Sequence, residues 1–313
     1  MRGCSRALTC AVSAILLLAL IMSKESLGME ALTEQNITVT FPPGSEAEAR
    51  RILECARKAQ ETFLPLFSTA KKLNLTVHWR TKEEWLRLQP KSKYGMPTAI
   101  GPDGVLLPAV NVDPPDALVE IIKPLTHPEK LPPAELQDFM KLAPKGPFTD
   151  VKAFEEYLGS AEFYTPFLID FVLPHEIMHT LCNQVGVLRQ PVWPYEGLAQ
   201  WSSDYFLHKQ GREGERRFYF LLYKMWYLAG VDDPKNENLV KFGNYAWFHG
   251  ALLTLFKQIE DECGEGLFPK LIKLAEDSHP AKAKFKNADW LGLFNQAAGR
   301  DLADRFKGKW AIP

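Results

Sequence analysis

The residues that could do chemistry gather between Pro174 and Leu181, a stretch that contains one H-E-x-x-H pattern. Each helical residue turns by about 100°, so His175 and His179 lie one turn apart on one face and can share a metal ion. Glu176 lies at the flank of that face, where its carboxylate can take a proton from a water molecule without ligating the metal. The spacing therefore predicts two zinc ligands and a general base.

A catalytic zinc ion usually takes three protein ligands and leaves its fourth position to water. Downstream, Glu196 lies in the segment P-Y-E-G-L-A-Q-W, residues 194–201. The proline is typical of a helix start, and the glycine lets the backbone come close to a neighbouring element. We therefore predict that His175, His179 and Glu196 bind one Zn²⁺ per chain.

These motifs resemble those of a known family. H-E-x-x-H followed, seventeen residues after its second histidine, by the glutamate of E-G-L-A-x-W is similar to the gluzincin zinc metallopeptidases. Within this family, the motifs resemble in particular the bacterial peptidase-MA-like group, which is related to the M1 aminopeptidases. The order of the expected helices and strands extends the resemblance over residues 36–280. The resemblance implies a zincin-like fold, with His175, His179 and Glu196 as zinc ligands and Glu176 as general base.

The resemblance also implies a donor for the oxyanion of the tetrahedral intermediate, near the start of a helix after Asn244. Tyr245 matches the family tyrosine by residue type, while His249 lies at a comparable distance from the closing glycine. Either side chain could donate the hydrogen bond, whose loss typically costs about 3 kcal/mol of transition-state stabilisation. A third interpretation is an aromatic pair buried in a helix bundle. The family's G-x-M-E-N motif is not matched by G-M-P-T at 95–98, so aminopeptidase activity is not implied.

A ligand imidazole needs a partner for its second nitrogen. Ser203 and Asp204 follow Glu196 by two turns and are candidates for this role, although solvated polar side chains are the alternative.

The cysteines offer no further ligand. Three remain after the first 28 residues, and an odd number favours free thiols over a disulfide framework.

Residues 1–28 have the pattern of a secretory signal peptide. Arg2 and Arg6 precede an apolar run from Ala7 to Met22, and small residues follow it. The alternative is an uncleaved membrane anchor, but the sixteen-residue run is short for a membrane-spanning helix, which needs about twenty residues. We predict a secreted or periplasmic protein.

The pattern of the chain predicts an α+β fold. Strands are expected at 36–41 and 73–80 and around 105–107 and 110–112. Helices are expected from Ser45 with a capping box to Glu48, and at 81–88, 134–142 and 150–158. The later expected helices are 165 or 170 to 184, 194–210, 215–229, 244–263, 267–275 and 289–306. Pro174 predicts either a start or a kink in the active-site helix.

We divide the chain into the signal (1–28), an N-terminal α+β part with a small mixed sheet (29–160) and a mainly helical part with the metal motifs (161–313). By family resemblance, a strand within 94–112 borders the substrate cleft. The proline-rich segment 113–150 either covers that cleft or lies on the surface.

Composition narrows the function. The net charge is −1, from 37 basic and 38 acidic residues. Because basic residues are not in excess, the composition does not indicate a nucleic acid partner. A membrane is a partner only if the signal is uncleaved. We predict an exported zinc metallopeptidase acting on a peptide or protein substrate. The alternative is a non-catalytic gluzincin-fold binding or scaffold protein that retains the metal. A coincidental H-E-x-x-H would instead place Glu196 far from both histidines.

Overall fold

The fold is known from a computed structural model that describes residues 28–187, 191–236, 238–240, 244–278, 285–307, 310 and 312. The predicted signal peptide therefore lies outside the described residues, apart from Gly28. Within the described ranges, no helix combines the length and the apolar character needed to span a bilayer.

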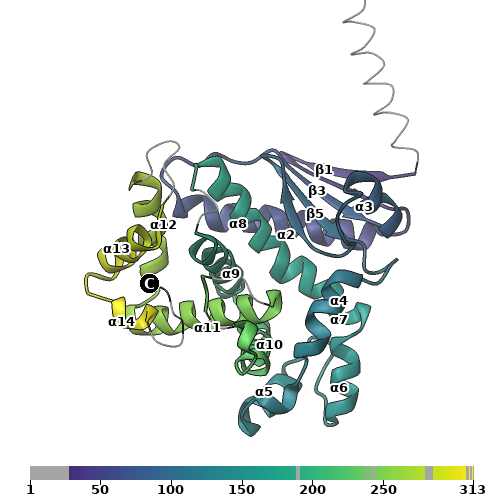
Figure 1. The fold of residues 1–313 in the computed structure, drawn as a ribbon. Helices are drawn as coiled ribbons and strands as arrows, with labels where there is room; N and C mark the ends of the chain where they lie inside the picture. Colours follow the sequence, from purple (N-terminus) through teal and green to yellow (C-terminus); the bar gives the residue numbers. More distant parts are fainter. Residues whose placement is uncertain are drawn as a thin grey trace, which may run out of the picture.

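A five-stranded mixed sheet forms one end of the molecule, with strand order β1-β2-β3-β5-β4 (Figure 1). The central strands β2 (Ile37–Phe41), β3 (Leu75–Arg80) and β5 (Gly104–Pro108) are parallel to one another. The outer strands β1 (Glu30–Glu34) and β4 (Thr98–Ile100) are antiparallel to their neighbours. Alternate residues of β2 are buried, as its sequence pattern predicted. The predicted α+β class with a small mixed sheet is confirmed.

The strand predicted at residues 110–112 is not present in the structure. Val110 and Val112 do not form a strand, because their amides bond to Pro108 and Ala109 in a tight turn. The turn follows β5 directly and carries the chain off the sheet.

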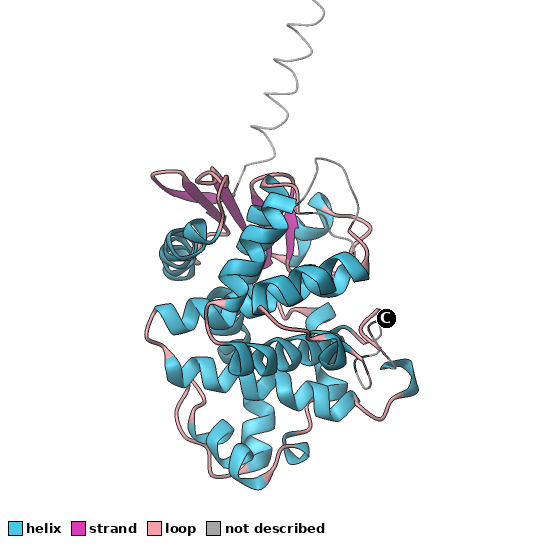
Figure 2. Cartoon of the chain, turned by 90° about the vertical axis from the view of Figure 1, so that its left-hand side faces the viewer, coloured by secondary structure: helices cyan, strands magenta, loops and turns pink. Residues whose placement is uncertain are grey.

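Helices make up the rest of the molecule (Figure 2). The α-helices outside the active-site run are α2 (Glu46–Phe63), α3 (Lys82–Leu88), α4 (Asp116–Ile122), α5 (Pro133–Lys141), α6 (Val151–Leu158), α9 (Val192–Lys209), α10 (Glu213–Gly230), α11 (Tyr245–Cys263), α12 (Leu267–Ser278), α13 (Asn287–Ala298) and α14 (Ala303–Phe306). Short 3₁₀ turns lie at η1 (Leu64–Leu66), η2 (Lys123–Leu125), η3 (Pro128–Lys130) and η5 (Pro234–Asn236). The other predicted helices are present, but the single helix predicted at 289–306 is divided into α13 and α14 by Gly299, which has a left-handed conformation. Helix α4 and the first residues of α7 were not predicted.

The start of α2 differs from its prediction. Ser45 is the N-cap residue, but its side chain makes no capping hydrogen bond to the helix. The Ser45 hydroxyl is fully buried and accepts a hydrogen bond from the Asn111 amide, at 2.9 Å. The expected capping box is therefore wrong, because a contact across the sheet competes for the hydroxyl.

The metal motif lies in one continuous helical run with a π-helical turn. α7 (Ala161–Phe167) leads into the π turn η4 (Leu168–Val172), which leads into α8 (Leu173–Gln184). The Leu173 amide bonds to the Leu168 carbonyl, five residues back. Pro174 has no amide proton, and the wider turn before it accommodates this missing donor. The α-helix α8 therefore begins one residue before Pro174, which confirms the predicted helix start, and the π turn η4 precedes it.

The π turn is anchored by a buried charge. Asp170, within this turn, is 3% exposed and accepts hydrogen bonds from Arg51 of α2 and from Arg212, the latter at 2.9 Å. A buried carboxylate is costly unless it is paired in this way. The two ion pairs tie the turn before the metal motif to α2 and to the start of α10.

The three cysteines among the described residues, Cys55, Cys182 and Cys263, are free thiols, as predicted for Cys55 and Cys182. Burial raises the pKa of both Cys55 and Cys182, that of Cys182 to about 12. Both side chains therefore behave as small apolar groups, not as nucleophiles or metal ligands.

His78 on β3 predicts a pH dependence of stability. Its Nδ1 lies 3.0 Å from both Thr40 Oγ1 and a guanidinium nitrogen of Arg80. Burial, reinforced by the Arg80 charge, lowers the pKa of His78 from 6.5 to about 4. Below its ordinary pKa the unfolded chain gains a proton that the folded chain does not bind. The free energy of unfolding therefore falls as the pH drops from 6.5 towards 4.

The free energy of unfolding should fall by roughly 1–2 kcal/mol less on acidification in His78→Gln than in the wild type. The effect is smaller than the full pKa shift of His78 would imply, because the ring is partly solvated. Urea unfolding at about pH 7 and about pH 4 measures the loss in each variant. His127→Gln, at an exposed histidine, is the matched control. Equal losses in the wild type and His78→Gln would contradict this account.

Candidate metal centre

The crossing of α8 and α9 brings the three predicted ligands together. Glu196 Oε2 lies 3.3 Å from His175 Nε2 and 3.1 Å from His179 Nε2. The two imidazole rings meet edge to face, with centroids 4.5 Å apart. Both histidines are buried, whereas the Glu196 side chain is 19% exposed. Glu196 is therefore not remote from the histidines, as a coincidental pattern would have placed it.

Close packing of α9 on α11 sets the position of Glu196. A Cβ atom at the next residue, Gly197, would lie 2.2 Å from Cζ of Phe256, a buried ring of α11. Only a glycine fits at this crossing, which explains the glycine in the sequence motif. The same close approach places the start of α9 beside α8.

We expect Gly197→Ala to lower the free energy of unfolding by about 1–3 kcal/mol, because the added methyl group must displace the Phe256 ring. Displacing the start of α9 should also weaken metal binding through Glu196. Thermal unfolding and metal titration measure the two effects. Gly292→Ala is the matched control, since a Cβ there meets open space within α13 and should stabilise the helix by up to about 1 kcal/mol. If Gly197→Ala left the free energy of unfolding unchanged, the packing argument would be contradicted.

A fourth side chain, His249 of α11, joins the cluster. One ligand atom each from His175, Glu196 and His249 lies within 4.8 Å of the other two, and this buried group could hold a metal ion. His249 Nε2 is 3.9 Å from Glu196 Oε2. The sequence suggested His249 only as an oxyanion donor. Its closeness to the ligands could not be inferred, because it depends on how α11 packs against α9.

The protonation state of Glu196 suits a metal ligand, and His249 beside it is neutral. Burial alone would raise the pKa of Glu196, but His179, His175 and His249 together lower it well below its ordinary value. Glu196 is therefore a carboxylate. Burial also lowers the pKa of His249 to about 3, which leaves a neutral imidazole. Ionised carboxylates and neutral imidazoles are the forms that bind divalent metals.

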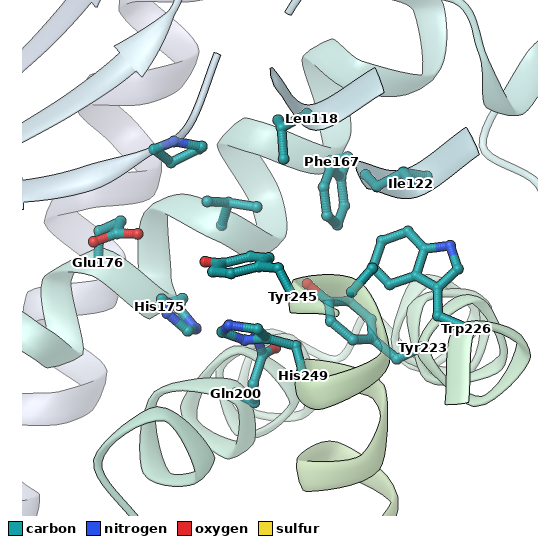
Figure 3. Close-up of a pocket in the computed structure, with 13 residues that line it drawn as sticks. Leu118, Ile122, Phe167, His175, Glu176, Gln200, Tyr223, Trp226, Tyr245 and His249 are labelled. Atoms are coloured by element: carbon teal, nitrogen blue, oxygen red, sulfur yellow. The ribbon is translucent and has the colours of Figure 1, made fainter. Parts of the chain in front are cut away.

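Glu176 and Tyr245 face the same space. Figure 3 shows the Tyr245 hydroxyl pointing towards Glu176 and His175. Burial and the nearby carboxylates of Glu196 and Glu176 raise the pKa of Tyr245 well above its ordinary value. Its hydroxyl therefore stays protonated and can donate a hydrogen bond. The rings of Tyr245 and His249 lie 4.1 Å apart. Both candidate oxyanion donors therefore reach the site from one face of α11.

An open cleft of about 500 Å³ leads to the cluster. Its walls come from α3, from the residues around β4, and from the start of α9: Trp85, Gln89, Ser92, Met96, Pro97, Thr98, Ala99, Val192 and Tyr195. Glu176, Tyr245 and the three predicted ligands complete the lining. The strand that borders the cleft is therefore β4, and the predicted run at 105–107 forms the interior strand β5.

An inner recess extends from Glu176 and His175 away from the cleft. Leu118 and Ile122 of α4, with Phe167 and Trp226, form its apolar wall (Figure 3). Its open volume is about 30 Å³, enough for one or two water molecules. The proline-rich segment thus contributes a wall of the site through α4, and is not only surface decoration.

The predicted orienting residues have other roles. Asp204 is 2% exposed and pairs with Arg216 at 2.8 Å, while the Ser203 hydroxyl donates to the Phe171 carbonyl at 2.6 Å. Both interpretations of these residues are wrong, because they neither contact a ligand nor lie in solvent. Among the described residues, His175 Nδ1 has no hydrogen-bond partner.

Tyr195 supports His179 in a way that the sequence did not indicate. Its ring stacks on the His179 imidazole with centroids 4.1 Å apart and 17° between the planes. The Tyr195 hydroxyl donates to Asn183 Oδ1 at 3.1 Å, which links the start of α9 to the end of α8. The stacking restricts the ring orientation of one predicted ligand.

Comparison of the sequence with models of protein families and with curated proteins finds no match, so the role of this site is argued from its geometry and chemistry.

Proposed function

We propose that this protein is an exported zinc-dependent metallopeptidase with a gluzincin-type fold. The observation that carries the proposal is the convergence of His175, His179 and Glu196 beside Glu176 at the inner end of an open cleft. Two imidazoles and one carboxylate are a donor set that catalytic zinc uses. The balanced net charge of −1 accords with a peptide rather than a nucleic acid substrate.

When bound, a zinc ion would lower the pKa of a water molecule and polarise the substrate carbonyl. Glu176 takes the proton of the attacking water and later delivers it to the leaving amine. Tyr245 or His249 donates a hydrogen bond to the oxygen that gains negative charge. The site is reached from the cleft, and residues of α4 and α10 line the inner recess.

The substrate backbone has a natural place along β4. This strand pairs with β5 on one side, and in the described sheet its other side carries no strand. An extended peptide could add to that edge by backbone hydrogen bonds. Thr98 and Ala99 of β4 line the cleft together with Glu176, so such a peptide would pass the general base.

One observation favours the non-catalytic alternative. With His249 close to Glu196, the site offers four protein donors, and a four-ligand zinc site is typical of a structural role. A scaffold protein that binds metal without turnover would have such a site.

Incubation of the zinc-loaded protein with a broad peptide library, read by mass spectrometry, separates the two functions. Cleavage that disappears on chelation and returns with zinc is expected for the peptidase. Bound zinc with no cleavage at any pH would favour the scaffold. The peptides that are cut then provide the substrate for the kinetic measurements below.

A further inference from the structure

The role of His249 depends on which of its ring nitrogens carries the proton. We infer that Gln200 holds His249 as a neutral imidazole protonated at Nε2, which makes His249 a hydrogen-bond donor into the site and not a fourth metal ligand. This inference rests on the proposed function and assigns Gln200 a positioning role in it.

The first support is the hydrogen bond between the two side chains. The Gln200 Nε2 amide group bonds to His249 Nδ1 (Figure 3). An amide nitrogen can only donate, so Nδ1 must accept with its lone pair. A neutral imidazole that accepts at Nδ1 carries its proton at Nε2. Gln200 is 3% exposed and His249 1% exposed, so water does not compete for this bond.

The second support is the orientation of the Gln200 amide. Gln200 also hydrogen-bonds Tyr223 of α10, and this bond acts to lower the pKa of the Tyr223 hydroxyl. Gln200 Oε1 has no hydrogen-bond partner among the described residues, so the bond to Tyr223 is donated by the amide nitrogen. Tyr223 is held against α11, because a Cβ at Gly250 would lie 2.3 Å from the Tyr223 carbonyl oxygen. Two acceptors on two packed helices therefore fix the amide nitrogen of Gln200.

The third support is the free end of the imidazole. His249 Nε2 is buried and has no hydrogen-bond partner among the described residues. Glu196 Oε2, at 3.9 Å, is beyond hydrogen-bond distance. A buried N–H group without an acceptor is rare in proteins. Since His249 and Glu176 line the same recess, this donor is available to an oxygen atom of a bound ligand.

The consequence concerns the open position of the metal site. A protonated Nε2 has no lone pair for a metal, so His175, His179 and Glu196 remain the only protein ligands of this cluster. Three ligands leave a position for water and substrate, whereas four would close the site. Gln200 therefore decides between the open, catalytic arrangement and the closed one.

The direct test is the tautomer of His249 in the zinc-loaded protein. Two-dimensional ¹H–¹⁵N spectra of histidine-labelled protein, assigned with His249→Phe, distinguish a proton on Nε2 from one on Nδ1. We expect Nε2–H in the wild type and in the control Gln210→Glu, at the far end of α9. In Gln200→Glu the new carboxylate should accept from Nδ1–H and reverse the tautomer. Nδ1–H in the wild type would overturn the inference.

The second test uses the metal itself. We expect His249→Phe to change the dissociation constant for zinc by less than about threefold and to leave the visible spectrum of the cobalt-substituted protein unchanged. Peptide hydrolysis should nevertheless fall by about 10²–10³-fold, as for the loss of an oxyanion donor. A tenfold or greater loss of zinc affinity would show that His249 is a ligand. The spectra and the affinity need no substrate, so they decide the inference even if the peptidase proposal fails.

Discussion

Replacing Glu176 by glutamine should lower kcat/KM for peptide hydrolysis by about 10²–10⁴-fold, the usual contribution of a general base. The amide keeps the size of the carboxylate but cannot take a proton from water. Glu176 is 4% exposed and lies on α8 directly after the first ligand, at the junction of the cleft and the inner recess. The measurement is steady-state turnover of a peptide identified in the library.

Two controls make the Glu176→Gln result specific. Metal content should stay the same as in the wild type, because Glu176 is not a ligand in the proposed site. Glu83→Gln, at an exposed position of α3, makes the same chemical change outside the site and should leave turnover unchanged. Wild-type turnover in Glu176→Gln would show that another group takes the proton, and the proposed mechanism would be wrong.

Much of the fold follows from local patterns. Alternating apolar residues predicted β2 and β3, and helical spacing predicted the major helices from α2 to α13. The metal cluster was also accessible, because the spacing of His175 and His179 depends only on helix geometry. The position of Glu196 needed one further clue, the P-Y-E-G motif at a helix start.

What could not be predicted depends on contacts between distant segments. β4 is a strand of three residues that pairs only with β5 within the described part of the chain, so its own sequence carries little signal. The sequence predicted a helix start or a kink at Pro174, but not the π turn that precedes it. Asp204 was expected to orient a ligand or to lie in solvent, yet it is buried against Arg216. Asp170 is buried against Arg51, which is 119 positions away in sequence.

The cluster of four possible donors shows the same limit. His249 was found as a candidate by its distance from the glycine that closes its helix, but its contact with Gln200 joins α11 to α9. No spacing rule connects residues 49 positions apart. The choice between ligand and donor therefore depends on a hydrogen bond that only the packed structure reveals.

Removing the metal should destabilise the protein. Because a metal that binds only the folded state adds about 4 kcal/mol when its concentration is 1,000 times its dissociation constant, chelation should lower the melting temperature by about 10 °C. One zinc per chain is expected by elemental analysis of the reconstituted protein. His175→Ala and Glu196→Ala should each lose the metal and should no longer respond to the chelator.

The controls separate loss of the site from loss of the fold. His127→Ala removes an exposed histidine distant from α8 and should keep both the metal and its stabilising effect. Glu196→Gln keeps the size of the side chain but removes the charge that the three imidazoles favour, so it should bind zinc far more weakly while remaining folded. If Glu196→Gln bound zinc as tightly as the wild type, Glu196 would not be a ligand. The centre would then have to be built from the histidines alone, and both the peptidase proposal and the role of the E-G-L-A segment would lose their basis.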